Sequence, residues 1–259
     1  QFNIAKRIPG KEEFFETIRY FGVRLKELKV DVKLNTRLTT QQLNMMQVDA
    51  LVLATGISPR TLELPGHDHA KVLNYLDVIK GAKVGAKVAI IGAGGIGFDV
   101  AEFLAHGERE PSKNIAQFMS QWGIDMTMQA RGGVAQMSQN IEASPRQIHL
   151  LQRKTSKVGA GLGKTTGWIH RAGLQQKQVQ MIAGCEYQAI DDQGLHLTID
   201  GKAQILDVDH IIVCAGQDPN QGLCDGLERE YHLIGGAHKA TQLDAKRAIR
   251  QGTLLAIEL

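Results

Sequence analysis

Cysteine is scarce in this sequence, which has only three among its 259 residues, at Cys185, Cys214 and Cys224. None of them belongs to a C-x-x-C pair, so they cannot by themselves hold a zinc ion or an iron–sulfur cluster. An odd number of cysteines is also atypical of a disulfide framework. We therefore expect all three side chains to be buried as small hydrophobic groups.

Long apolar runs and an excess of one charge are missing as well. No apolar stretch reaches the roughly 18 residues of a membrane-spanning helix, and the first residues lack the apolar core of a signal peptide. The 30 basic and 27 acidic side chains leave a formal net charge of +3, and the basic ones are spread along the chain rather than gathered in a stripe. The nine histidines show no metal-ligand spacing. We therefore expect a soluble, cytoplasmic protein that has no membrane, nucleic-acid or metal partner.

Apolar residues recur with helical or strand periods along most of the chain. The pattern predicts helices over residues 11–29, 75–79, 114–123, 163–178 and 243–257. It predicts strands over residues 30–35, 49–56, 88–91, 147–154, 179–191, 194–200 and 209–216. The run at 49–56 is apolar enough to indicate a strand buried on both faces. Because strands and helices alternate through the middle of the chain, we expect an α/β fold with a doubly wound, Rossmann-like parallel sheet.

The strongest local signal is a glycine fingerprint that follows the strand at 88–91 and opens a helix. It has the form G-x-G-x-x-G and consists of Gly92, Ala93, Gly94, Gly95, Ile96 and Gly97. In such a turn the first glycine permits a tight bend, the second lets the backbone approach a pyrophosphate, and the third lets the helix pack closely on the strand. The diphosphate then lies at the helix N-terminus, where unpaired N–H groups and the helix dipole favour an anion. An ordinary glycine turn is the alternative, but the strand-before and helix-after context favours dinucleotide binding.

The residues after the next strand indicate which dinucleotide is bound. An NAD site usually has an acidic residue there, whereas this strand ends in Gln152, Arg153 and Lys154. Arg153 and Lys154 can pair with a 2′-phosphate, so the sequence favours NADPH over NADH. The assignment requires residues 108–145 to be an insertion, and a solvated basic loop remains the alternative.

A second glycine-rich segment, residues 161–166, resembles part of a phosphate-binding loop. It lacks the G-x-x-x-x-G-K-[ST] spacing, because Val158 stands where the first glycine is needed. The capped N-terminus of a helix explains it as well. Lys157, Lys164 and Arg171 remain candidates for a supporting role at a phosphate.

Two Ala-x-Gly segments bracket the fingerprint: one is Ala54-Thr55-Gly56, and the other begins with Ala215-Gly216. This order resembles the two-dinucleotide-binding-domain flavoproteins, in which an NAD(P)H domain is inserted into an FAD domain. The resemblance implies that Ala215 and Gly216 lie at the NADPH side. It implies FAD contacts from Gln1, Ala54, Thr55, Gly56, Gly235 and Gly236. Gly236 replaces the aspartate that is usual in that family, so any contact there must come from the backbone.

Further segments resemble the bacterial NADPH-dependent 2,4-dienoyl-CoA reductases, and the similarity extends over nearly the whole chain. They are residues 114–118, 122–125, 144–147, 151–154, 163–171 and 243–249. In that family an N-terminal barrel carries FMN, a 4Fe-4S cluster and the catalytic acid residues. Electrons pass from NADPH to FAD, then through the cluster and FMN to a dienoyl-CoA in the β-oxidation of unsaturated fatty acids.

This chain resembles only the last third of such an enzyme. The resemblance implies a partial FAD domain at residues 1–83 and 217–259 around an NADPH domain at 84–216. The sequence opens at Gln1 without a methionine, and we expect the barrel and the FAD fingerprint to lie upstream. We therefore expect weak or absent FAD in this part, no catalytic side chain, and no dienoyl-CoA reduction by this part alone.

Two other readings stay open. One is a different NADPH-to-flavin electron-entry module, such as a relative of the glutamate synthase small subunit, although residues 122–125 (WGID) argue against it. The other is a non-catalytic relic that holds ADP, as in trimethylamine dehydrogenase. The intact glycine fingerprint and the basic pair at 153–154 favour a working NADPH site.

Overall fold

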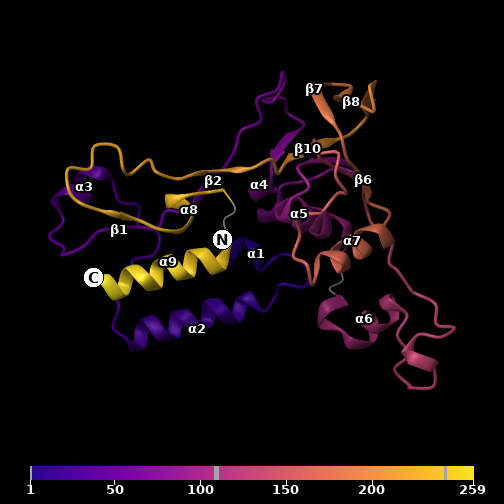
Figure 1. Cartoon of the computed structure of the whole chain (residues 1–259), viewed down its shortest axis with the longest axis horizontal. Coiled ribbons are helices and arrows are strands. Elements are labelled where there is room, and N and C mark those ends of the chain that lie inside the picture. Colours follow the sequence, from indigo (N-terminus) through magenta and orange to yellow (C-terminus); the bar gives the residue numbers. More distant parts are fainter. Residues whose placement is uncertain (1, 108–110, 242–243) are drawn as a thin grey trace. The chain divides into compact units, whose positions relative to one another are not determined.

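The computed structural model describes residues 2–107, 111–241 and 244–259, and the chain forms two compact units. Unit 1 comprises the N-terminal residues up to Gly22 together with Thr61–Ala215. Unit 2 comprises Val23–Arg60 and Gly216–Leu259. Figure 1 follows the order of the elements along the chain.

A five-stranded parallel sheet forms the centre of unit 1. Its strands, in spatial order, are β3 (Val72–Asn74), β10 (His210–Val213), β4 (Lys87–Ile91), β5 (Gln147–Leu151) and β6 (Gln180–Ile182). The predicted Rossmann-like α/β class is confirmed by this sheet. Because β5 pairs directly with β4, the strand at 147–151 is the spatial neighbour that the coenzyme assignment requires.

The two faces of this sheet are covered by different layers. Along β4, Val88 and Ile90 lie in a core shared with helices, whereas Ala89 and Ile91 lie in a second core. The alternation follows from the two-residue period of a strand. The helical side consists of α1 (Phe2–Ala5), α4 (Tyr75–Lys80), α5 (Gly95–Ala105) and α7 (Gly167–Gln176). The other core contains an antiparallel sheet of β7 (Glu186–Asp191), β8 (Gly194–Ile199) and β9 (Lys202–Leu206).

The segment between α5 and β5 contains little regular structure. It includes η1 (Pro111–Lys113), α6 (Ile115–Trp122) and η2 (Arg131–Gly133). Asn114 caps α6 by accepting a hydrogen bond from Gln117 N, and the helix ends at Gly123 in the left-handed conformation. The predicted helix at 114–123 is confirmed.

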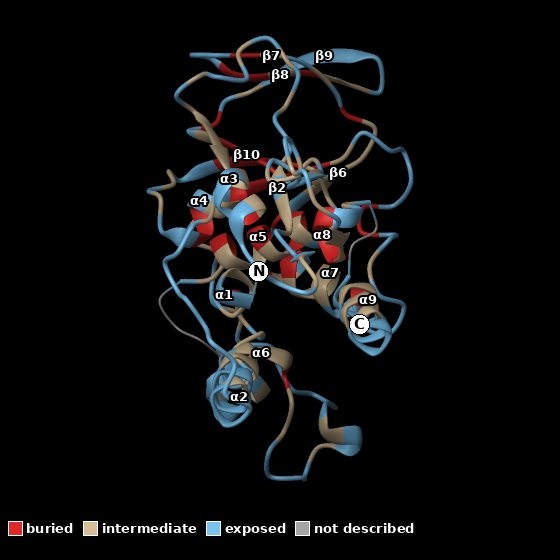
Figure 2. Cartoon of the chain, turned by 90° about the vertical axis from the view of Figure 1, so that its left-hand side faces the viewer, coloured by how far each residue is buried: buried red, intermediate tan, exposed pale blue. Residues whose placement is uncertain are grey.

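Unit 2 has only small sheets. β1 (Val52–Leu53) pairs in parallel with β12 (His232–Leu233), and β2 (Ile57–Pro59) pairs antiparallel with β11 (Gln217–Pro219). Its helices are α3 (Thr40–Met45), α8 (Gly235–His238) and α9 (Ala245–Glu258). Helix α2 (Phe14–Glu27) runs from the end of the first segment of unit 1 into unit 2. Figure 2 shows buried residues on α5 and β10, whereas α2 and α9 carry none.

Several predicted strands differ from the structure. Residues 30–35 form no strand, because their alternating side chains have no partner strand and are exposed. The run at 49–56 contributes only β1, in which Val52 is 37% exposed, so it is not buried on both faces. The run at 179–191 is divided by Gly184, at a φ of +70°, into β6 and β7 of different sheets.

Unit 1 is also larger than the domain expected at 84–216. Ile8, Tyr75 and Val78 belong to the same core as β4 and α5, and β3 pairs with β10. Residues on both sides of the expected boundary are therefore joined by apolar packing and by the backbone hydrogen bonds of one sheet. Which dinucleotide each unit binds stays a proposal.

The three cysteines are free thiols. Cys185 and Cys214 are buried, as predicted, and Cys224 is half-buried. Burial raises the pKa of both the Cys185 and the Cys214 thiol, so these side chains are poor nucleophiles near neutral pH.

Candidate dinucleotide-binding site

Gly92 begins the glycine fingerprint at the carboxyl end of β4. Its φ is +109°, and a Cβ at this position would lie 2.6 Å from the Cys214 carbonyl oxygen. Its N–H donates to the Leu151 carbonyl at 2.9 Å, and Cys214 N–H donates to the Ile91 carbonyl at 2.8 Å. The turn is therefore held between the ends of β5 and β10, and only glycine fits its conformation and its space.

Gly97 allows α5 to pack closely against this turn. A Cβ on Gly97 would lie 1.8 Å from the Gly92 carbonyl oxygen and 3.4 Å from Leu150 Cδ1. The residue is buried in the first turn of α5. This contact is the physical reason for the third glycine that the sequence pattern predicts.

Gly94 and Gly95 differ from these two glycines, because the space around them is open. Both are exposed, and no heavy atom lies within 4 Å of a Cβ built on either residue. Gly94 is the N-cap of α5 and provides no side-chain cap. The first N–H groups of a helix lack intrahelical partners, so this open end can receive a diphosphate. Ala93 and Ile96 complete the turn and pack at the edge of the helical core.

The outer side of α5 carries two ion pairs that the sequence pattern did not reveal. Lys11 Nζ lies 2.6 Å from Asp99 Oδ1, and His170 Nδ1 lies 2.7 Å from Glu102 Oε1. Burial raises the pKa of the Asp99 carboxyl, and the Lys11 ammonium opposes that rise. The hydrogen bond to Glu102 raises the pKa of the His170 imidazole. The acid spacing of i and i+3 on α5 is the only sequence signal for this arrangement.

Arg153 and Lys154 lie in the turn after β5, and both are exposed. Neither head group forms an ion pair with a residue that the structure describes. Burial raises the pKa of the Tyr187 phenol, and the positive charge of Arg153 is close enough to oppose this effect. The two cationic residues thus follow the carboxyl end of β5, which pairs with the strand that leads into the fingerprint.

The residues just before the second glycine-rich segment pack on α5. A Cβ on Gly159 would lie 2.7 Å from Phe98 Cζ, and Val158 belongs to the helical core. Arg171 Nη1 donates to the Gly159 carbonyl at 3.0 Å, so Arg171 holds the loop. Lys157 and Lys164 are exposed. The loop at Val158 and Gly159 thus has a packing role, and a phosphate contact from Lys157, Lys164 or Arg171 stays a prediction.

The first Ala-x-Gly segment and the residues that follow the second come together within unit 2. Thr55 Oγ1 donates to the Asn220 carbonyl at 2.5 Å, and Asn220 N–H donates to the Gly56 carbonyl at 3.0 Å. Ala54 is exposed, and Gly216 has a φ of +115°. Ala215, the last residue of unit 1, is half-buried.

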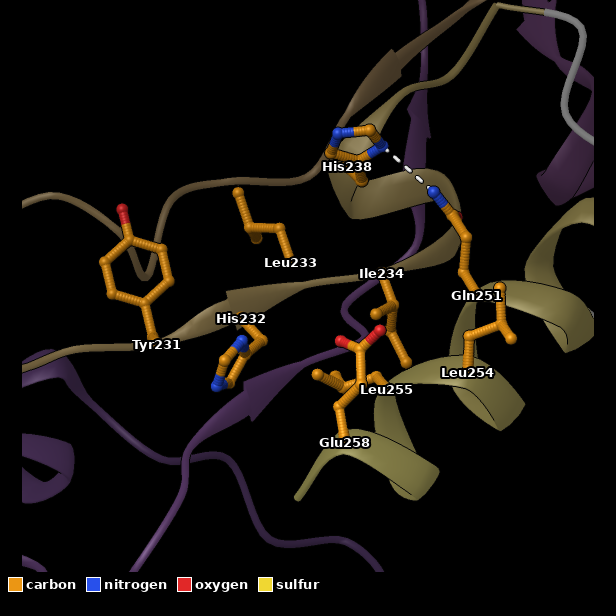
Figure 3. Close-up of a pocket in the computed structure, with 9 residues that line it drawn as sticks. All are labelled: Tyr231, His232, Leu233, Ile234, His238, Gln251, Leu254, Leu255 and Glu258. Carbon is orange, nitrogen blue, oxygen red and sulfur yellow. Dashed lines mark hydrogen bonds between the residues drawn. The ribbon is translucent and has the colours of Figure 1, made fainter.

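The remaining residues predicted to contact FAD lie at the start of α8. Gly235 and Gly236 are buried, and Gly235 N–H donates to Gln251 Oε1 at 2.9 Å. Gln1 lies outside the described residues. A cleft of about 430 Å³ lies beside these glycines, lined by β12, α8 and α9. In Figure 3, His238 and Gln251 face each other across this region, and their hydrogen bond measures 3.1 Å.

Two further observations concern the part of the chain that the structure describes. There, no group of three or more His, Cys, Asp or Glu side chains is placed to hold a metal ion. No helix among the described residues is long and apolar enough to cross a lipid bilayer.

The parallel sheet, the constrained turn and the open helix end define a Rossmann-type dinucleotide-binding protein. The chain belongs to the pyridine nucleotide-disulphide oxidoreductase family, which it matches over residues 6–237. Family membership implies sites for FAD and NAD(P)H in an oxidoreductase.

Three similar proteins are each much longer than this chain. A metal reductase from Desulforamulus reducens is 24% identical over 247 residues, which are 92% of this chain and 36% of that protein. A 2-naphthoyl-CoA reductase structure superposes with a TM-score of 0.78 at 21% identity, covering 100% of this chain and 34% of that one. A structure of histamine dehydrogenase from Rhizobium sp. 4-9 superposes with a TM-score of 0.71 at 14% identity, covering 100% of this chain and 38% of that one. The chain thus spans about a third of the length of these relatives.

Proposed function

We propose that this chain is the electron-entry region of a 2,4-dienoyl-CoA reductase, in which unit 1 binds NADPH and unit 2 contributes part of an FAD site. When bound, NADPH supplies a hydride and FAD accepts it. The open helix end at Gly94 and Gly95, beside the exposed Arg153 and Lys154, carries this proposal. The location that we propose for it is the cytoplasm.

The residues of this chain bind and orient the coenzyme. The N–H groups at the start of α5 receive the diphosphate, while Arg153 and Lys154 pair with the 2′-phosphate. Lys11 balances the charge of Asp99 one turn along the same helix, so this carboxylate opposes an incoming phosphate less. None of these side chains acts as a general acid, because positioning and electrostatics are sufficient for hydride transfer between two coenzymes.

The rest of the proposed electron path lies outside this chain. In the proposed enzyme, a barrel with FMN and a 4Fe-4S cluster receives the electrons and reduces the dienoyl-CoA. The likeness to a reductase of a CoA thioester, 2-naphthoyl-CoA, supports this class of substrate. Supplied with NADPH, FAD and a 2,4-dienoyl-CoA, the chain alone should leave the conjugated-diene absorbance unchanged.

Two alternative functions differ from the proposal, one in its substrate and the other in its nucleotide preference. An electron-entry module of the glutamate synthase type also prefers NADPH, and transfers electrons without a CoA substrate. A relic that holds ADP binds ADP at least as tightly as NADPH. The likeness to histamine dehydrogenase, an amine dehydrogenase by name, is the observation behind this second alternative.

Coenzyme preference tests the proposal directly. NADPH should bind more tightly than NADH or ADP, and Arg153→Ala should weaken NADPH binding by about tenfold, because a charge-assisted hydrogen bond is lost. NADH affinity should change little in the variant. Titration of the intrinsic NADPH fluorescence, with NADH in parallel, measures both. Equal affinity of the unmutated chain for NADPH and NADH would remove the basis for the NADPH assignment.

A further inference from the structure

Gln152 stands at the start of the turn that carries Arg153 and Lys154. Its side-chain amide Nε2 donates two hydrogen bonds, to the Lys154 carbonyl at 3.0 Å and to the Ser156 carbonyl at 2.5 Å. One side chain therefore joins the beginning of the turn to two carbonyl groups further along it. Leucine or methionine at this position could donate neither bond.

The backbone of the same turn is fixed to its neighbours. Gln152 N–H donates to the Ile182 carbonyl at 2.9 Å, and Cys185 N–H donates to the Gln152 carbonyl at 3.0 Å. Gly184 N–H donates to the Lys154 carbonyl at 3.0 Å. These bonds attach the turn to the segment after β6. The Ser156 end is joined to the rest by Gln152 Nε2.

Such anchoring matters because the side chains it supports are exposed and long. Arginine and lysine lose considerable rotamer freedom when they bind an anion. A backbone already fixed in the binding geometry lowers the ordering cost of that step. Arg153 and Lys154 extend from a turn of this kind.

We propose that Gln152 is a positioning residue for coenzyme selection, because its amide holds the 152–156 turn in the shape that presents Arg153 and Lys154 to the 2′-phosphate of NADPH. This inference rests on the proposed function. It predicts that Gln152 strengthens the binding of NADPH and has no such effect on the binding of NADH, which lacks the 2′-phosphate.

The test compares Gln152→Leu with the matched control Gln175→Leu, which changes an exposed glutamine on α7. Gln152→Leu should weaken NADPH binding by about fivefold, the effect of losing a neutral hydrogen bond or two. NADH binding should stay within about twofold of the unmutated chain, and the control should change neither coenzyme. If Gln152→Leu does not fold, Gln152→Met keeps an unbranched side chain of similar length without the donor.

A double-mutant cycle separates this role from a general effect on stability. If Gln152 acts through the basic pair, Gln152→Leu should have no further effect on NADPH affinity in the Arg153→Ala/Lys154→Ala background. Equal weakening of NADPH and NADH, or the same loss in both backgrounds, would overturn the inference. If the unmutated chain shows no NADPH preference, the proposed function fails. If the preference exists and persists in the Gln152 variants, only this inference fails.

Discussion

At the scale of single residues, glycine is found at three positions of one fingerprint for different physical reasons. Gly92 adopts a positive φ against the Cys214 carbonyl, and Gly97 touches the Gly92 carbonyl. Gly94 has open space and a φ of −83°, which any residue can adopt. The fold therefore requires glycine at positions 92 and 97, whereas position 94 requires glycine only where a ligand approaches.

This difference predicts that alanine substitutions at Gly97 and Gly94 have different effects on stability. Gly97→Ala should lower the free energy of unfolding of unit 1 by about 2 to 3 kcal/mol, because the new methyl group overpacks the turn. Gly94→Ala should change it by less than about 0.5 kcal/mol and still weaken NADPH binding. Both tryptophans, Trp122 and Trp168, lie in unit 1, so urea unfolding followed by tryptophan fluorescence reports on this unit. Equal destabilisation by both variants would contradict the assignment.

At the scale of elements, α5 is held by contacts on two sides. Its apolar residues pack on the sheet, and its outer residues pair with the N-terminal segment through Lys11 and with α7 through His170. Helix α5 is thus fixed to elements distant in sequence. The fold shifts the pKa of the Asp99 carboxyl and of the His170 imidazole, so the attachment of α5 depends on pH.

The His170–Glu102 pair gives this dependence a definite sign. The folded-state pKa of His170 is raised above the ordinary value of 6.5, so the protonated imidazole stabilises the fold. This contribution is complete below about pH 6.5 and is lost as the pH rises through the folded-state pKa. His170→Gln should therefore destabilise unit 1 more at acidic than at alkaline pH.

Two measurements check this prediction. Urea unfolding of the unmutated chain and of His170→Gln, between about pH 5.5 and pH 8.5, should show a stability difference that shrinks as the pH rises. An NMR titration of the His170 ring should give a lower pKa in Glu102→Gln. A stability difference that is independent of pH would show that the imidazole charge plays no part.

At the scale of the whole molecule, the two units bury very different amounts of apolar surface. The largest fully buried side chains, among them Phe98, Ile90 and Leu150, all belong to unit 1. Among the described residues of unit 2, only Leu43, Leu53 and Ala237 are buried hydrophobic residues. Two-residue strands such as β1 and β12 provide little stability by themselves.

The contrast predicts unequal protection from hydrogen exchange. Amides of β4, β5 and β10 should exchange only through opening of the unit 1 core, whereas amides of α9 and β12 should exchange orders of magnitude faster. Mass spectrometry of peptides from each unit measures the two rates in one sample. Similar protection in α9 and in β4 would show that unit 2 has a stable core of its own.

The sequence by itself determined the features that depend on neighbours along the chain. The apolar strand 88–91, the glycine fingerprint and the helices at 114–123 and 163–178 were predictable, because periodicity, capping residues and glycine conformation act over a few residues. The Rossmann-like class followed from their alternation. The candidate residues 92–97 and 153–154 were found in the same way, although their roles remain proposals.

Only the tertiary structure decided the features that depend on partners far apart in sequence. The Lys11–Asp99 pair joins residues separated by 88 positions, and the acid spacing on α5 does not identify Lys11 as the partner. Residues 30–35 have a strand pattern and no partner strand, whereas β9, which the pattern missed, pairs with β8. The hydrogen bonds of Gln152 likewise appear only when the turn after β5 is folded. Strand pairing and ion pairing depend on proximity in space, which is set by the packing of the sheet and its helices rather than by the order of residues.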